Sequence, residues 1–131
     1  MAIPVAVNAQ EYMLGMTRSE VMRETQHLRM TSGGSGNARG FLYDDYRELH
    51  APYRNTTRFY FGEDGKCHAI MEAVDRSVAS LVMEEIRDRF VHMIDNIWTS
   101  TDNEVQATII FDRDMFTVMY KAIETRSSQH R

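Results

Sequence analysis

The sequence has one cysteine and two prolines among its 131 residues, and only two of its fifteen basic residues are lysines. A single cysteine, Cys67, excludes an intramolecular disulfide, so we expect a reducing, cytoplasmic setting. No run approaches the ~18 apolar residues that span a bilayer. The apolar start of the chain also lacks the basic region of a signal peptide. These absences predict a protein that works away from membranes.

A large charge of one sign is also missing, because the net charge at pH 7 is −4. Residues 1–61 carry seven arginines against six acidic residues, a balance of +1. Residues 62–131 carry eight basic and thirteen acidic residues, a balance of −5. The net charge disfavours a nucleic-acid duplex or an anionic membrane as partner. Any bound anion is therefore expected on the first half of the chain.

Glycine is concentrated in one stretch, TSGGSGNARGF (residues 31–41), which holds four of the seven glycines. The stretch lacks the lysine of a Walker phosphate loop and the spacing of a dinucleotide-binding fingerprint. We interpret it as a flexible Gly/Ser-rich linker. It follows a predicted helix over residues 17–30, which begins with the capping-box pair Thr17 and Glu20. Residues 1–40 are therefore predicted to form an N-terminal arm and a linker, which lets residues 1–30 move relative to the rest.

The remaining chain predicts an antiparallel sheet. Alternating apolar residues indicate hairpins over residues 57–73 and 105–120, each with a short polar turn. Between them, apolar residues recur at helical spacing and predict one long amphipathic helix over residues 76–97. The expected fold class is α+β, a two-layer ββαββ domain over residues 41–125, followed by a polar tail, residues 126–131.

One helix cannot cover both faces of such a sheet. Both faces carry apolar residues, for example Ile70 and Val74 on the side away from Cys67. The N-terminal arm or a second subunit is needed to cover the remainder. The sequence therefore predicts a homo-oligomer, a dimer or higher, with arm exchange as one route.

The segment from Arg39 to Phe61 is the richest candidate site, with seven of the thirteen aromatic residues and four arginines. Tyrosine and arginine are enriched at protein interfaces because both bury a large area and still form hydrogen bonds. We assign Phe59 and Phe61 to the core. The predicted partner-binding residues are Tyr43, Tyr46, Arg47, Tyr53 and Arg54. The leading interpretation is a non-catalytic, oligomeric protein-binding module, such as an adaptor, inhibitor or assembly factor, with no cofactor.

Two alternatives remain open. Bases stack on aromatic rings and arginines meet phosphates, so the same segment suits single-stranded nucleic acid or a nucleotide. The residues for this second interpretation are Arg39, Arg54, Arg58 and Tyr60. A weaker third interpretation is a metal-dependent enzyme, because an acidic stripe with one histidine would lie along the predicted long helix. The residues of that stripe are Glu85, Asp88, His92 and Asp95.

Overall fold

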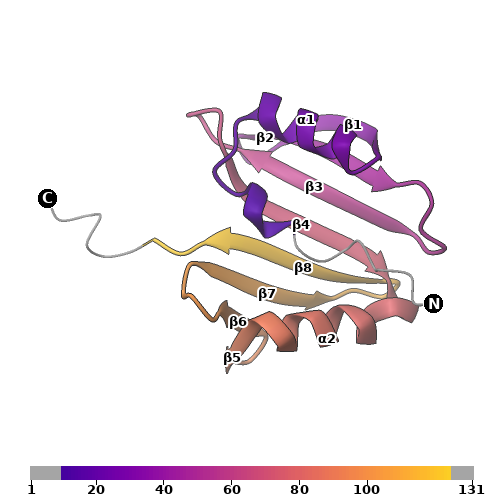
Figure 1. Ribbon diagram of the computed structural model, residues 1–131, viewed down its shortest axis with the longest axis vertical. Coiled ribbons are helices and arrows are strands. Elements are labelled where there is room, and N and C mark those ends of the chain that lie inside the picture. Colours follow the sequence, from indigo (N-terminus) through magenta and orange to yellow (C-terminus); the bar gives the residue numbers. More distant parts are fainter. Residues whose placement is uncertain (1–9, 125–131) are drawn as a thin grey trace, which may run out of the picture.

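The computed structural model describes residues 10–124. Two α-helices and two short 3-10 helices accompany one antiparallel sheet (Figure 1). The helical elements are η1 (Glu11–Met13), α1 (Arg18–His27), η2 (Arg76–Val78) and α2 (Ala79–Arg89). The strands are β1 (Met30–Ala38), β2 (Phe41–Glu48), β3 (Asn55–Phe61), β4 (Cys67–Asp75), β5 (Phe90–Ile94), β6 (Ile97–Ser100), β7 (Val105–Phe111) and β8 (Met115–Ala122).

The sheet consists of two meanders joined at the centre. Its strand order is β1-β2-β3-β4-β8-β7-β6-β5, and all paired strands are antiparallel. Each half of the described chain is a helix followed by four consecutive strands, and the last strand of each half, β4 or β8, pairs with the other. The first strand of each half, β1 or β5, is therefore an outer edge, and the two edges lie at opposite ends of the molecule (Figure 1).

The predicted two-layer ββαββ fold with one long helix is wrong, because the helix expected over residues 76–97 ends at Arg89. Phe90 adopts extended backbone angles, φ −128° and ψ 156°, and begins β5. The residues that follow are rich in β-branched side chains, which favour strands. A tight turn at Asp95, with φ 50°, then reverses the chain into β6. The apolar spacing of α2 continues across this hairpin, so periodicity alone extended the helix too far.

The predicted flexible linker is also not observed, because its residues form the edge strand β1. β1 pairs with β2 from Met30 opposite Glu48 to Ala38 opposite Phe41. The reversal uses Arg39 and Gly40, both with positive φ, 53° and 86°, as a two-residue hairpin turn requires. Backbone hydrogen bonds can hold such an edge without apolar side chains. The domain boundary expected at residue 40 therefore falls within a hairpin turn.

Three local predictions are confirmed. α1 begins at Thr17, whose side chain accepts from the backbone N–H of Glu20, and the Glu20 carboxylate accepts from the Thr17 backbone N–H at 2.9 Å. Both predicted hairpins form, as β3 with β4 and β7 with β8. The predicted polar tail lies outside the described residues.

Replacing Thr17 by alanine is expected to lower the free energy of unfolding by about 1 kcal/mol. The substitution removes the side-chain oxygen that satisfies one backbone N–H at the start of α1. Urea denaturation would measure the change. Ser19→Ala, at an exposed position in the same turn, is the matched control and should change stability by less than about 0.5 kcal/mol. Equal effects of the two substitutions would contradict a stabilising cap.

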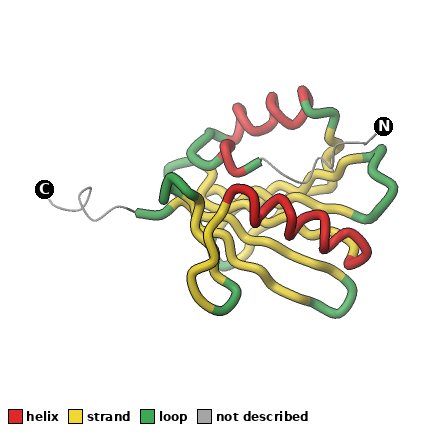
Figure 2. Tube along the Cα trace, turned by 60° about the horizontal axis from the view of Figure 1, so that its bottom comes forward, coloured by secondary structure: helices red, strands yellow, loops and turns green. Residues whose placement is uncertain are grey.

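Both helices pack on the same face of the sheet (Figure 2). Val21 of α1 and Val82 and Ile86 of α2 join one buried cluster with side chains from β2, β3, β4, β7 and β8. The opposite face, called the open face below, is covered by none of the described helices. Within residues 10–124, no helix is long and apolar enough to cross a bilayer.

Candidate functional site

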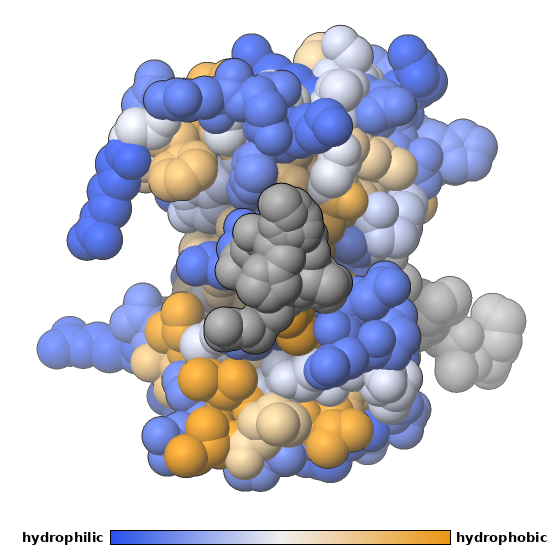
Figure 3. All heavy atoms as spheres, turned by 90° about the vertical axis from the view of Figure 1, so that its left-hand side faces the viewer, coloured by the Kyte–Doolittle hydropathy of each residue, from blue (hydrophilic) through white to orange (hydrophobic). Residues whose placement is uncertain are grey.

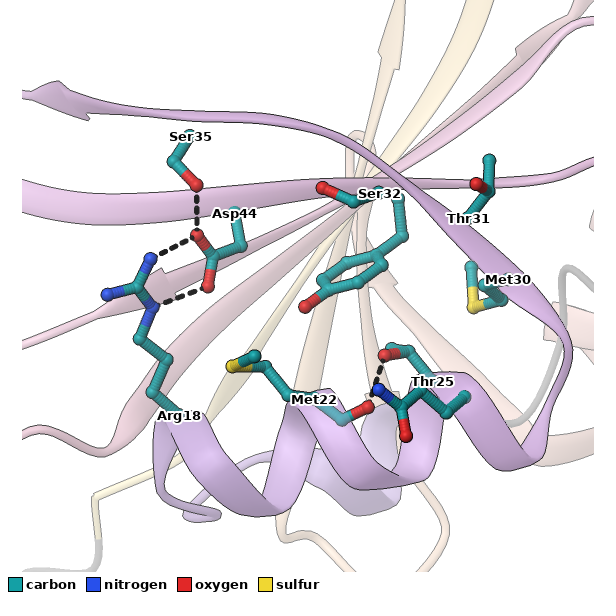
Figure 4. Close-up of a pocket in the computed structure, with 10 residues that line it drawn as sticks. Arg18, Met22, Thr25, Met30, Thr31, Ser32, Ser35 and Asp44 are labelled. Carbon is teal, nitrogen blue, oxygen red and sulfur yellow. Dashed lines mark hydrogen bonds and ion pairs between the residues drawn. The ribbon is translucent and has the colours of Figure 1, made fainter.

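A cleft of about 290 Å³ lies between α1 and the strands β1 and β2 (Figure 4). Asp44 is at its wall with a side chain only 6% exposed. The Asp44 carboxylate accepts from Arg18 Nε at 2.7 Å and Nη2 at 2.8 Å, and from Ser35 Oγ at 2.6 Å. The remaining lining residues are Met22, Thr25, Gln26, Met30, Thr31, Ser32 and Tyr46.

The ion pair in this cleft is a structural joint between α1 and the edge of the sheet. Burial alone would raise the pKa of Asp44, but the hydrogen bonds from Arg18 and Ser35 outweigh it, so the pKa lies below its usual value. Arg18 belongs to α1, Ser35 to β1 and Asp44 to β2, so one carboxylate holds three elements together. The hydrogen-bond partners of Asp44 come from the protein itself, so this carboxylate stabilises the fold.

The open face presents one continuous row of residues across all eight strands. Pairing registers place its members opposite one another in the order Gly34, Asp45, Arg58, Met71, Met119, Thr108, Ile97 and Ile94. The row is charged toward β2 and β3, thioether-rich at the centre and aliphatic toward β5. None of the described helices covers this row, most of whose side chains are partly exposed.

An arginine and two tyrosines form the polar end of the open face. The Arg58 guanidinium lies 3.8 Å from the centroid of the Tyr43 ring, a cation–π contact. Arg58 also donates to both carboxylate oxygens of Asp45, at 2.7 and 3.0 Å. The hydrogen bond to Asp45 raises the pKa of Arg58 above its ordinary value. Tyr60 lies beside Tyr43, with ring centroids 6.0 Å apart, so the Arg58–Asp45 ion pair is flanked by two aromatic rings.

Apolar side chains are exposed at the β5 end of the sheet. Val91, Met93 and Ile94 are 52%, 60% and 61% exposed, and Ile110 on β7 is 43% exposed. Figure 3 shows apolar surface gathered at the lower end of the molecule, the end that holds α2, β5 and β6 in Figure 1. Exposed apolar side chains gathered at one end of a sheet make that end a candidate interaction site.

The predicted partner-binding residues are divided between the two faces. Tyr43 and Arg47 lie on the open face. Tyr46 lies on the helix-covered face, 8% exposed, with its ring 5.7 Å from that of Phe59. Tyr53 packs partly buried against the core, and Arg54 pairs with Asp75 at 3.2 Å. The structure thus brings only part of the set to one surface.

The predicted nucleic-acid residues are also dispersed. Arg39 lies in the β1–β2 turn, and Arg54 precedes β3. Arg58 and Tyr60 share the open face, where Asp45 compensates the Arg58 charge. These arginines therefore do not form a cationic groove of the kind that follows a nucleic-acid backbone.

The predicted metal stripe is not formed, because the end of α2 separates its members. Glu85 and Asp88 lie on α2, His92 lies on β5, and Asp95 lies in the following turn. The His92 imidazole instead contacts the Asp95 backbone oxygen at 2.7 Å and the Trp98 ring. Among residues 10–124, no group of three or more His, Cys, Asp or Glu side chains is placed to hold a metal ion.

Comparison with protein-family models, with curated proteins and with solved structures finds no match to this chain.

Two further titratable side chains, those of Cys67 and Glu72, are buried on β4. Cys67 is 3% exposed, as its position in an apolar strand predicts, and burial raises the pKa of its thiol to about 12. Glu72 on β4 is 3% exposed, and its Oε2 atom has no hydrogen-bond partner. Glu72 lies in phase with Ile70 and Val74 on the helix-covered face. The alternation of this strand could therefore have predicted that its carboxyl is buried.

Proposed function

We propose that this chain is a non-catalytic protein-binding module that presents the open face of its sheet to a protein partner. The observation that carries the proposal is the continuous row from Asp45 and Arg58 to Ile97 and Ile94. Its composition supports protein contact, since methionine, tyrosine and arginine are enriched at the centres of interfaces. The buried, unpaired Cys67 supports a reducing, cytoplasmic setting.

The electrostatics of the open face favour a protein over a nucleic acid. Arg58 is held by Asp45 through two hydrogen bonds, so binding a phosphate there requires breaking an internal ion pair. Arg47 and Lys121 add two exposed basic side chains to the open face, and apolar side chains fill the centre and the β5 end. A protein partner with an apolar contact surface and a few acidic side chains complements this pattern.

Substituting Ile110 by aspartate is expected to reduce capture of the partner from the native host at least tenfold, about 1.4 kcal/mol. Ile110 is 43% exposed on the open face, so a carboxylate there would be desolvated on binding. Quantitative mass spectrometry of material retained by the tagged protein measures the effect. Leu81→Asp is the matched control, since Leu81 is 41% exposed on the outer surface of α2.

Equal loss or equal retention by the Ile110 and Leu81 variants would contradict recognition by the open face. The nucleic-acid alternative makes a different prediction, because its binding should weaken steeply with salt through counterion release. Retained material that is nuclease-sensitive and lost at high salt would favour that alternative.

A further inference from the structure

The two halves of the described chain repeat one another in structure and, within their helices, in sequence. Each half is a helix followed by four antiparallel strands. The first strand of each half carries a bulge at the same place, between Ser32 and Gly34 in β1 and between His92 and Ile94 in β5. Both α1 and α2 contain the pattern S-x-V-M-x-E, over residues 19–24 and 80–85. Each position in one half therefore has an equivalent in the other.

The first half has a cleft at positions where the second half has larger side chains. The equivalent pairs along the cleft are Thr25 and Ile86, Met30 and Phe90, Ser32 and His92, and Tyr46 and Trp98. Ile86 and Phe90 are 0% and 3% exposed, and the Trp98 ring lies 4.8 Å from that of His92. Because protein interiors are close-packed and the second half fills this space, the cleft results from the small side chains of the first half and is not required by the fold.

We propose that the cleft between α1 and the strands β1 and β2 binds a small, uncharged aromatic compound that carries a hydrogen-bonding group. The volume of about 290 Å³ has room for about ten water-sized groups at roughly 30 Å³ each. A single ring with one polar substituent fits that space. The proposal goes beyond the proposed function, because the ligand is not a protein and the cleft lies on the helix-covered face, away from the open face.

The charges in the cleft favour an uncharged ligand. The charged side chains that line it are Arg18 and Asp44, and two hydrogen bonds join them to each other. A charged ligand would lose hydration on entry without meeting an unpaired charge of opposite sign. An uncharged polar group can instead bond the hydroxyls of Thr31 and Ser32 and the amide of Gln26, which line the cleft and are at least partly exposed.

The apolar part of the lining favours an aromatic ring. Figure 4 shows the thioethers of Met22, on α1, and Met30, at the start of β1, at two sides of the cleft. Thioether sulfur makes favourable contacts with aromatic rings. In the second half, the rings of Phe90 and Trp98 occupy positions equivalent to cleft-lining residues. The protein itself thus places aromatic groups in the corresponding part of its other half.

Benzamide, benzoate and protonated benzamidine test the ligand class, because they share one ring and differ in charge. Titration of the purified chain, followed by amide NMR spectra, should give a dissociation constant on the order of 1 mM for benzamide. The resonances that shift should belong to α1, β1 and β2, and the two charged probes should bind at least tenfold more weakly. Equal affinity for the three probes, shifts confined to other elements, or no saturable shift would each overturn the proposal.

Variants that copy the second half test the location. Ser32→His introduces the residue type found at the equivalent His92 and should weaken benzamide binding at least tenfold. Thr25→Ile, which copies the buried Ile86, should have the same effect. Ser19→His is the matched control, because Ser19 is exposed on α1 and does not line the cleft.

Wild-type affinity in both the Ser32 and the Thr25 variant, or equal losses in the Ser19 control, would overturn binding in the cleft. The titration uses the purified chain and a small molecule alone. Its failure is therefore distinguishable from failure of partner capture through the open face.

Discussion

Replacing Arg18 by methionine is expected to lower the free energy of unfolding by about 2–3 kcal/mol at neutral pH. The substitution leaves the buried Asp44 carboxylate with Ser35 as its remaining side-chain donor. The Arg18 side chain is itself 44% exposed, so we place the cost below that of breaking a fully buried pair. α1 and the β1 edge should loosen together, because Asp44 connects them. Urea denaturation and hydrogen exchange of β1 would measure both effects.

The pH dependence gives this prediction a second readout. In the folded protein the pKa of Asp44 lies below its ordinary value. Its stabilising contribution is therefore fully present above the unfolded-chain pKa of about 3.9 and is lost as pH falls through the folded pKa. The difference between wild type and Arg18→Met should shrink in that acidic range. Arg23→Met, at an exposed position of α1, is the control, and an equal loss there would contradict the role of the ion pair.

Replacing Glu72 by glutamine is expected to raise the free energy of unfolding at neutral pH, by an amount on the order of 1 kcal/mol. Glu72 lies on a central strand, and its Oε1 atom accepts a long hydrogen bond from the Tyr120 hydroxyl at 3.4 Å. Burial raises its pKa well above the ordinary value. Glutamine has a similar shape and carries no charge to desolvate.

The sign of the pH effect follows from that raised pKa. The unfolded chain loses the Glu72 proton above about pH 4.3, whereas the folded chain retains it to higher pH. Wild-type stability should therefore decrease as pH rises from about 4.3 to the folded pKa, and Glu72→Gln should lack this decrease. Glu84→Gln, at an exposed position of α2, should leave the profile unchanged. A Glu72→Gln profile parallel to the wild-type profile would contradict a buried, protonated carboxyl.

Local sequence patterns predicted the elements whose stabilising contacts are local. The capping box at Thr17 and the hairpin turn ending at Gly65 each depend on a few adjacent residues. β1 depends on backbone pairing with β2 and on the contact between Arg18 and Asp44, 26 residues apart. No pattern within the Gly/Ser stretch itself reports those contacts, so composition indicated a linker.

The candidate surface was only partly predictable for a related reason. Composition predicted a recognition segment from its tyrosines and arginines, but the strand phase of β2 decides which face each side chain occupies. Tyr43 and Arg47 point to the open face, whereas Tyr46 points into the core. At β5, the apolar residues fit both a helical and an extended period, and only the turn at Asp95 resolves the ambiguity. Because of that ambiguity, the sequence did not predict β5 as an exposed apolar edge strand.

The placement of β1 and β5 as the two outer strands leaves the two ends of the sheet unequal. If both edges were apolar, each copy could add another at either end, and the product would be an open filament. β1 consists mostly of small and polar residues and carries a bulge between Ser32 and Gly34. An open filament needs both edges, and the polar edge β1 therefore disfavours one.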